Sequence, residues 1–321
     1  MERHRGAPGE ERHSGEPPSR CSLVASRLAA GAAVEAALHP KPGAVTPCAS
    51  HPDKAAWDFM VHTAAIGEAA AAACRASLSG GDPLEAGLEA YARAIATLPL
   101  PGSNVGLGEA LLLTPLAGAL ARAPLGAGCE PGPVALEASR IARSSGGGAA
   151  GAYYALLQRL SPSHLGRYEG PVPGVGGGDP DSMLDVLLAA RWDHVHAELL
   201  EGYPRTLHTL STLRRARRRG AGLGEAALEA LLEGLAELGD TLILAKWGVR
   251  AYQKARAEAA WALTLHRAGK LTLHEALEAL DRLWRPRRWN PGAMLDILAA
   301  ALGLELACQP AGASTWAYQP P

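Results

Sequence analysis

The sequence lacks the features of a β-sheet protein. Only one of its 321 residues is phenylalanine, and aromatic residues make up 5% of the chain. Hydrophobic residues make up 48%, but most are alanine and leucine, and no run places a β-branched residue at every second position. Such alternation is typical of a half-buried strand. Its absence favours an all-α protein.

The cysteines lack the spacing of a disulfide framework and of a cysteine-ligated zinc site. They are odd in number, scattered, and include no CxxC pair. Their positions are Cys21, Cys48, Cys74, Cys129 and Cys308. We therefore expect reduced thiols in a cytoplasmic protein.

The chain also lacks an excess of charge of either sign. Its 31 basic and 32 acidic residues leave a formal charge of -1, so no overall field attracts nucleic acid or an anionic membrane. The basic run at 214–219 has no interleaved aromatic residues and is typical of a solvated helix end. No uncharged apolar run is long enough to span a membrane, and residues 1–20 lack the apolar core that a signal peptide would need, so we do not expect them to be one. We predict neither nucleic acid nor a membrane as partner, and the oligomeric state stays open.

Apolar residues recur at i, i+3 and i+4 through most of the chain, which predicts amphipathic helices. The predicted ranges are 22–38, 55–79, 82–97, 105–122, 133–144, 149–160, 181–202, 205–218, 223–238, 241–268, 273–284 and 291–303. We predict a single compact all-α domain of about ten to twelve helices over 21–305. A disordered tail (1–20) precedes it and a C-terminal tail (306–321) follows. The glycine-rich loop 161–180 is the longest and is typical of a functional lid or a disordered segment.

The segment "ALHPKPGAVTP" holds one lysine rigidly just after a helix. Pro40 and Pro42 flank Lys41, and Gly43 permits a close approach of the backbone to a ligand. Such rigidity and close approach suit a contact with a bound ligand. The alternative is an ordinary surface turn.

The segment "SNVGLG" is a glycine-rich turn that leads into an apolar helix. Asn104 and Gly106 lie at its start, where free N–H groups and the helix dipole favour an anion. The GK[ST] ending of a P-loop is absent. A capped, buried helix is an equally good interpretation.

Asp53 and Asp58 flank the start of the next helix along "HPDKAAWDFMVH". Paired carboxylates are the oxygen ligands that Mg²⁺ takes. In the alternative interpretation, Ser50 and Asp53 form a capping box and Asp58 pairs with His62 on the surface. "DHVH" at 193–196 places its histidines on different helix faces, so we expect no metal pair there.

The helix from 241 carries a basic stripe. Lys246, Arg250 and Lys254 recur at four-residue spacing, and Asp240 is placed to cap the helix. A solvated face is the usual meaning of such a stripe, but Lys246 follows a run of apolar residues.

Asp296 stands in a helix that is otherwise apolar almost all round. An unpaired buried carboxylate costs several kcal/mol, so this residue should have a partner or a metal. Asn290 and Pro291 are typical of a helix cap followed by a first turn, and Gly292 comes next.

Four of these segments, taken in order, resemble the triphosphoribosyl-dephospho-CoA synthase family over about 24–304. They are "PKPG" at 40–43, "SNVGLG" around Asn104, "DTLILAKWG" from Asp240, and "NPGAMLDIL" with Asp296. The chain departs from family members that serve citrate lyase. It has "HPDKAAWDFM" in place of their Gly-Ala-His-x-Asp-Met segment. It has "VGLG" from Val105 in place of their Thr-His-Lys-Gly run. The segments "SPSHLGRYEG" and "RWDHVHAELLEGY" are closer to an archaeal branch associated with methanopterin-type cofactors.

The resemblance implies an ATP-using transferase of cofactor biosynthesis, with Mg²⁺ as its cofactor. In that reaction the 2′-hydroxyl of dephospho-CoA displaces adenine from ATP. The implied catalytic groups are Asp53, Asp58, Asp240 and Asp296, of which the first three are also implied metal ligands. The implied substrate-binding residues are Lys41, Gly43, Asn104, Gly106, Lys246, Arg250, Asn290 and Gly292. The resemblance implies a phosphate contact for Lys41. Its side chain supports no predicted core, so we expect that removing it weakens ATP binding and leaves the melting temperature nearly unchanged. An enzyme with a different, methanopterin-type acceptor and a non-catalytic nucleotide-binding protein are the alternatives.

Overall fold

The computed structural model describes residues 19–100, 104–162 and 180–310, and these residues form thirteen α-helices and no strand. The helices are α1 (Arg20–Ala37), α2 (Ala56–Ser79), α3 (Pro83–Thr97), α4 (Leu107–Leu120), α5 (Pro131–Ser144), α6 (Gly147–Leu160), α7 (Met183–Ala189), α8 (His194–Glu201), α9 (Pro204–Arg218), α10 (Leu223–Glu237), α11 (Thr241–Arg267), α12 (Leu273–Trp284) and α13 (Gly292–Ala307). A short 3₁₀ turn spans Gly126–Gly128. The prediction of an all-α fold is confirmed.

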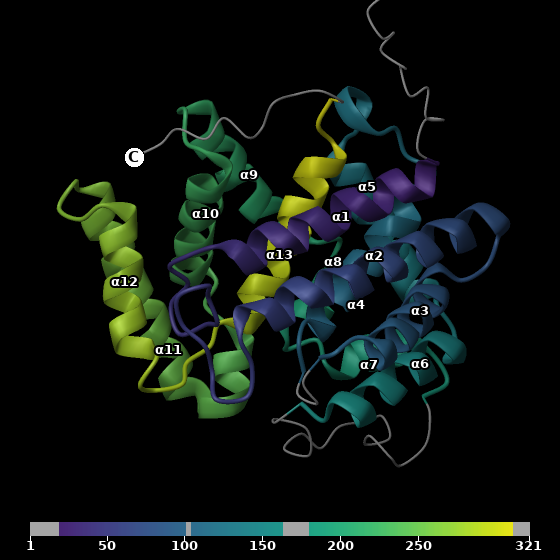
Figure 1. Cartoon of the computed structure of the whole chain (residues 1–321), viewed down its shortest axis with the longest axis horizontal. Helices are drawn as coiled ribbons and strands as arrows, with labels where there is room; N and C mark the ends of the chain where they lie inside the picture. Colours follow the sequence, from purple (N-terminus) through teal and green to yellow (C-terminus); the bar gives the residue numbers. More distant parts are fainter. Residues whose placement is uncertain (1–18, 101–103, 163–179, 311–321) are drawn as a thin grey trace, which may run out of the picture.

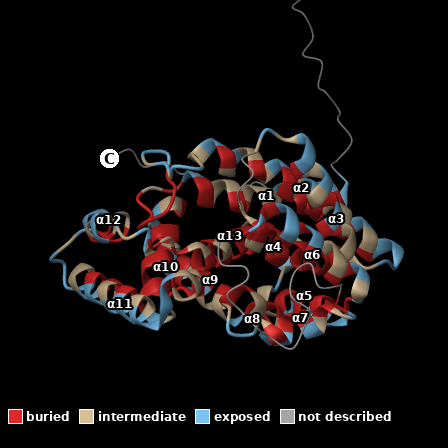
Figure 2. Ribbon diagram, turned by 90° about the horizontal axis from the view of Figure 1, so that it is seen from below, coloured by how far each residue is buried: buried red, intermediate tan, exposed pale blue. Residues whose placement is uncertain are grey.

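Two helices that are apolar on every side form the centre of the molecule. All of α4 except Gly108 is buried, and all of α13 except Gly292, Asp296 and Leu306. A helix that is hydrophobic all round must be covered on all sides. In Figure 2 the buried residues concentrate around α13, α4 and α10, whereas α11 and α12 at the edge expose more of their surface.

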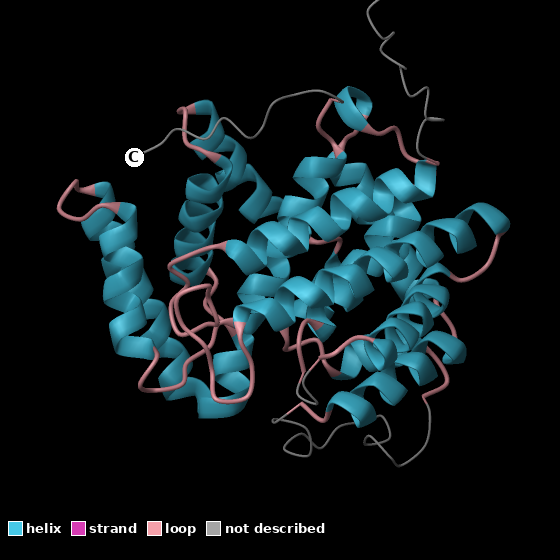
Figure 3. Cartoon of the chain, in the orientation of Figure 1, coloured by secondary structure: helices cyan, strands magenta, loops and turns pink. Residues whose placement is uncertain are grey.

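The other helices pack around this pair. α1 lies along α2 and crosses α13, α2 continues the layer to α3 and α4, and α9 and α10 pack beside α13. The antiparallel pair of α11 and α12 lies at one edge of the molecule (Figure 1). A long loop joins α1 to α2, and Figure 3 shows it among the loops near the lower ends of several helices. This loop carries the Pro-Lys-Pro-Gly segment.

The predicted helix at 181–202 is wrong as a single element. α7 ends at Ala189 and α8 begins at His194, and Asp193 caps α8 by accepting a hydrogen bond from the His196 backbone N–H. An Asp side chain competes with the helix for backbone N–H groups, so it favours a new helix start over continuation. The apolar spacing continues across the break, which is why periodicity alone did not reveal it.

The expectation that the cysteines are reduced thiols is wrong for four of the five. Cys21 of α1 is bonded to Cys74 of α2, and Cys129 is bonded to Cys308 just after α13. These pairs are separated by 53 and 179 residues, so only the packing of the helices brings them together. Cys48 alone is free, and it is exposed.

The predicted tails and the long loop fall mostly outside the described residues, in 1–18, 163–179 and 311–321. α1 begins at Arg20, because the Ser19 side chain caps the helix there. α13 also runs two residues beyond the predicted end at 305. Among the described helices, none combines the length and apolar character needed to cross a bilayer.

Candidate active site

Five elements meet around a group of buried charged side chains. They are the C-terminal end of α1 with the loop after it, and the N-termini of α2, α4, α11 and α13 (Figure 1). Its acidic members are Glu35, Glu109, Asp240 and Asp296, and we call them the carboxylate cluster. Helix N-termini carry partial positive charge, so they are the ends that can best hold buried carboxylates.

Lys41 belongs to this group, but it points inward and not toward solvent. Its Nζ lies 2.8 Å from Glu35 Oε1 and donates a second hydrogen bond of 2.9 Å to the Glu35 carbonyl. Both side chains are 3% exposed, so this is a buried ion pair. The interpretation as an ordinary surface turn is therefore wrong. The expectation that Lys41 supports no core is wrong as well, because the segment after α1 folds back and buries it.

Glu109 and Asp296 face each other across the N-termini of α4 and α13. The Asp296 carboxylate accepts a hydrogen bond from the Glu109 backbone N–H, and a Cβ on Gly108 would lie 2.0 Å from Asp296 Oδ2. Burial and, next, the charge of Glu35 raise the pKa of both carboxyls well above the usual range. Asp296 raises the pKa of Glu109 further. Asp296 as a whole residue is half-buried, but its carboxyl group lies away from solvent between these two helices, which is the setting that the sequence predicted.

His62 of α2 fills the space beside Gly106. Gly106 has a φ of 80°, and a Cβ there would lie 2.2 Å from the His62 ring. The ring is 1% exposed, neither nitrogen has a hydrogen-bond partner of good geometry, and Nδ1 lies 3.6 Å from Glu109 Oε2. Burial lowers the pKa of His62 to about 3, so the ring is neutral at pH 7. The suggestion that His62 pairs with Asp58 on the surface is wrong, because both residues are buried.

Asp240 joins two helices of the cluster. One oxygen accepts from the Ile243 N–H of α11 and the other from the Met294 N–H of α13, both at 2.9 Å. The predicted cap of α11 is confirmed. The predicted Asn290 cap of α13 is wrong, because Asp240 takes that place. Burial raises the pKa of Asp240 to about 7, even though both N–H groups favour the charged form.

The double cap predicts that Asp240→Asn lowers the free energy of unfolding by about 1–2 kcal/mol. An amide offers one acceptor oxygen, so one of the two helix N–H groups must lose its partner. Urea unfolding measures the change. Asp82→Asn is the matched control, because one oxygen of Asp82 accepts both of its helix-cap bonds, from Leu84 and Glu85. Equal losses in the two variants would contradict the double cap.

The two aspartates of the 50s segment lie in different settings. Asp58 accepts a hydrogen bond from the Ala55 N–H at 2.7 Å and is buried. Asp53 lies in the turn before α2 with Lys54 Nζ 3.4 Å away. The suggested Ser50–Asp53 capping box is not formed, since α2 starts at Ala56.

Lys54 links this segment to the turn before α4. Its Nζ donates to the Asn104 carbonyl at 2.9 Å, and Asn104 Oδ1 accepts from the Leu107 N–H. The interpretation of "SNVGLG" as a capped helix start is therefore correct. A phosphate contact at Asn104 or Gly106 stays a prediction.

The basic stripe on α11 is interrupted. Gly248 has a φ of 80° and a ψ of 175°, which breaks the helix between Lys246 and Arg250. Arg250 is exposed beyond the break. Lys246 lies near the site: burial and then the charge of Lys54 lower its pKa, while Asp53 and Asp240 raise it. The prediction of one continuous stripe is wrong.

The remaining predicted binding residues, Gly43, Asn290 and Gly292, lie close against other parts of the protein. Gly43 has a φ of 67° and donates its N–H to Asp281 Oδ1 at 2.8 Å, and a Cβ there would overlap the Trp289 carbonyl. Asn290 has a buried Oδ1 without a partner, and Gly292 packs against Leu242. Substrate contacts at these three positions stay predictions.

Sequence reasoning missed Glu35, Glu109 and His62. Glu35 and Glu109 each stand in a run of alanine and leucine, which is the same signal that singled out Asp296.

Sequence reasoning also missed a chain of hydrogen bonds beside the cluster. Tyr153 Oη lies 2.9 Å from His196 Nε2, and His196 Nδ1 lies 2.7 Å from Asp193 Oδ2. His194 and His196 lie in neither of the two groups of potential metal ligands among the described residues.

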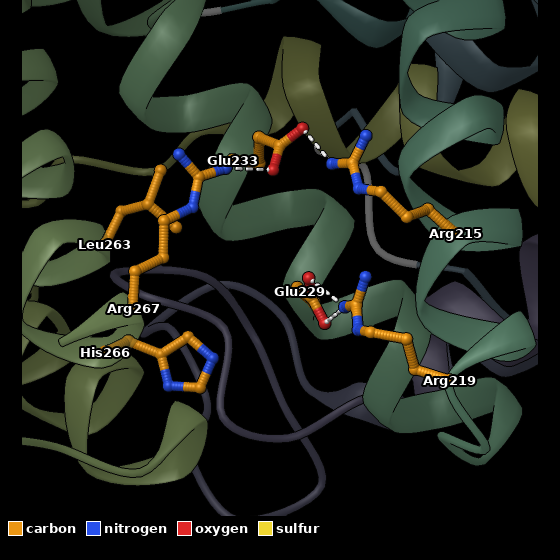
Figure 4. A pocket seen from close by; sticks show the side chains of 7 residues that line it. All are labelled: Arg215, Arg219, Glu229, Glu233, Leu263, His266 and Arg267. Atoms are coloured by element: carbon orange, nitrogen blue, oxygen red, sulfur yellow. Dashed lines mark hydrogen bonds and ion pairs between the residues drawn. The ribbon is translucent and has the colours of Figure 1, made fainter. Parts of the chain in front are cut away.

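A separate pocket of about 420 Å³ lies between α9, α10 and α11 (Figure 4). Its arginines come partly from the basic run at 214–219 and pair with glutamates of α10. Arg215 Nη2 lies 2.6 Å from Glu233, and Arg219 Nη2 lies 2.6 Å from Glu229. Arg267 also pairs with Glu233. Because these ion pairs neutralise most of the charge, the pocket does not resemble a site for a triphosphate.

The predicted metal ligands Asp53, Asp58 and Asp240 do not form a preassembled site. Among the described residues, only two groups of three or more ligands have their atoms within 4.8 Å of one another, and neither contains these aspartates. Mg²⁺ usually takes one or two carboxylates and completes its shell with water and phosphate oxygens. The carboxylate cluster is chemically suited to that arrangement.

The model of the ATP:dephospho-CoA triphosphoribosyl transferase family matches residues 21–315 of the chain. A Stutzerimonas stutzeri protein named "Probable 2-(5''-triphosphoribosyl)-3'-dephosphocoenzyme-A synthase" is 33% identical over 118 residues. The Klebsiella pneumoniae 2-(5''-triphosphoribosyl)-3'-dephosphocoenzyme-A synthase is 31% identical over 105 residues. These alignments cover 36% and 32% of this chain, and 41% and 38% of the relatives.

A solved structure from Archaeoglobus fulgidus, provisionally titled a triphosphoribosyl-dephospho-CoA synthase, is similar in fold. The TM-score is 0.52 at 19% identity, and the match covers 76% of this chain and 97% of that one. At this identity the likeness supports the helical arrangement and nothing finer.

Proposed function

The chain belongs to the ATP:dephospho-CoA triphosphoribosyl transferase family, and we propose that it transfers the triphosphoribosyl group of ATP to the 2′-hydroxyl of 3′-dephospho-CoA, with release of adenine. The observation that carries the proposal is the carboxylate cluster at the N-termini of α4 and α13. Both substrates are products of metabolism inside the cell, so the proposal includes a cytoplasmic location and a role in cofactor biosynthesis.

The reaction needs what buried carboxyl groups supply. The 2′-oxygen forms a bond to C1′ of the ribose while the bond from C1′ to adenine breaks, so positive charge develops on the sugar. As in glycoside hydrolysis, one carboxylic acid protonates the leaving group, one carboxylate accepts the hydroxyl proton, and negative charge stabilises the sugar cation.

The environment of each carboxyl group indicates which of these roles it takes in the proposed reaction. Glu109 and Asp296 have raised pKa values, so at least one of them holds a proton that it can donate to adenine. Glu35 is held by Lys41 2.8 Å away and supplies fixed negative charge. The neutral ring of His62 lies beside Glu109 and the Gly106 backbone, where it is placed to bind a polar edge of the substrate.

The triphosphate needs cations that solvent can reach. Lys41 is buried in its ion pair with Glu35, so we assign the phosphates to the less buried Lys54 and Lys246, whose charges lie close enough for Lys54 to lower the pKa of Lys246. Mg²⁺ would bind with ATP through phosphate oxygens and through Asp53 or a carboxylate of the cluster. When bound, it would neutralise part of the phosphate charge.

Incubation with ATP and 3′-dephospho-CoA tests the function directly. We expect adenine to appear in equal amount with a triphosphoribosyl adduct, and we expect neither product when dephospho-CoA is left out. Liquid chromatography with mass detection measures both products. Release of adenine only with another acceptor, or nucleotide binding without turnover, would contradict the proposal.

A further inference from the structure

Two histidines and a glutamate converge on the outer side of the Lys41 segment. His39 comes from the loop after α1, and His274 and Glu278 lie one turn apart on α12. One ligand atom of each residue lies within 4.8 Å of the others. His274 Nε2 is 3.3 Å from Glu278 Oε1, and the two imidazole rings meet edge to face at 5.9 Å.

The first histidine is oriented by a partner on its far nitrogen. His39 Nδ1 lies 3.2 Å from Thr46 Oγ1. Thr46 is buried, and the same hydroxyl oxygen accepts a hydrogen bond from the Cys48 N–H. With Nδ1 engaged, Nε2 is the atom left to bind a ligand. Metal-binding histidines are usually fixed in this way, by a hydrogen bond on the nitrogen that does not touch the metal.

The two segments are already held together by other contacts. The Gly43 N–H donates to Asp281 Oδ1 of α12, and Arg285 Nη2 donates to the Ala44 carbonyl at 2.8 Å. Ligands from both sides are therefore placed before an ion binds, so little ordering is needed on binding. Arg282 Nη1 lies 3.8 Å from Glu278 Oε2, but the Arg282 side chain is 71% exposed and can move away.

The second group of potential ligands on the described part of the chain is unsuitable. It consists of His208, Glu233 and Glu237. Glu233 already accepts from Thr212 and pairs with Arg215 and Arg267. A divalent cation there would have to displace two arginines.

We propose that His39, His274 and Glu278 bind a Zn²⁺ ion. Two imidazole nitrogens and one carboxylate oxygen are a ligand set that zinc takes in tetrahedral sites, with water as the fourth ligand. The ion would join the loop after α1 to α12. This inference does not depend on the proposed reaction.

Zinc titration of the full-length protein tests the site. The protein is first stripped with a chelator and dialysed, and then titrated with ZnCl₂ by calorimetry. We expect one ion per chain and loss of that binding in His274→Ala, whose side chain is 56% exposed, so the fold should be kept. Thr46→Val keeps the shape of the buried residue, removes the partner of His39, and should weaken binding by about 10–100-fold.

His208→Ala is the matched control and should bind zinc as the unmodified protein does. Co²⁺ titration gives a second measurement, because a tetrahedral site produces strong visible absorption that His274→Ala should abolish. Zinc affinity that is unchanged in His274→Ala would overturn the proposal. So would affinity that is lost in His208→Ala and kept in His274→Ala.

Discussion

Replacement of Asp296 by Asn is expected to lower adenine release by about 10²–10⁴-fold, the usual contribution of an acid–base group. The substrate-free protein should keep or gain stability. These opposite effects follow from the position of the carboxyl. It lies between two helix N-termini, and burial and the charges of Glu35, Asp193 and Asp240 raise its pKa well above the usual range. Such a group is poorly solvated when charged, and an amide of the same shape removes that cost.

The sign of the pH dependence follows from the raised pKa. The folded protein holds the Asp296 proton more tightly than the unfolded chain, so the contribution of this group to stability is largest at low pH. It is lost as the pH rises through the folded-state pKa. In Asp296→Asn the fall in stability over that range should be smaller. Urea unfolding at a series of pH values measures the difference.

Asp185→Asn on α7 is the matched control, because this carboxyl is exposed and lies on an outer helix. Its turnover should be unchanged, and its stability should change by about 0.5 kcal/mol or less. Unchanged turnover in Asp296→Asn would remove α13 from the active site. A large loss of stability in the same variant would make Asp296 a structural residue.

Much of the fold could be predicted because the spacing of apolar residues within each segment indicates a helix. The fully apolar runs of α4 and α13 predict central helices, and the structure buries both. The break at Asp193 and the bend at Gly248 were missed, because each depends on a local backbone conformation that apolar spacing does not encode. The disulfides were missed for a related reason: only packing brings cysteines 53 and 179 residues apart into contact.

The candidate site was predicted in part. Asp296 and Asp240 could be selected because an isolated carboxylate in an apolar segment needs a partner. The kind of partner could not be inferred from the sequence. Asp240 binds backbone N–H groups of two helices, and Lys41 binds a glutamate six residues earlier. Pro40, Pro42 and Gly43 mark the turn after α1, but they do not show which side chain Lys41 will meet. The contact of Asp240 with Met294 depends on the packing of α11 against α13, which apolar spacing does not reveal.

Lys41→Met should lower the free energy of unfolding by about 3–5 kcal/mol, the usual cost of removing one partner from a buried ion pair. The Glu35 carboxylate would lose its hydrogen bond from Lys41 Nζ, and the Glu35 backbone carbonyl would lose the second one, while the Glu35 side chain stays 3% exposed. Chemical unfolding of the purified protein measures the change. This is the opposite of what a solvent-facing phosphate contact would give.

A double variant separates the charge effect from the loss of packing. Glu35→Gln with Lys41→Met leaves no uncompensated charge, so most of the lost stability should return, and the coupling between the two changes gives the strength of the pair.

Lys54→Met is the companion variant for nucleotide binding. Its side chain lies nearer the surface, at 17% exposed, and its charge influences Lys246. It should weaken ATP binding with a much smaller effect on stability. One outcome would contradict this assignment: Lys41→Met weakens ATP binding without loss of stability, and Lys54→Met leaves ATP binding unchanged. In that case Lys41 would leave Glu35 and contact the phosphates of the nucleotide.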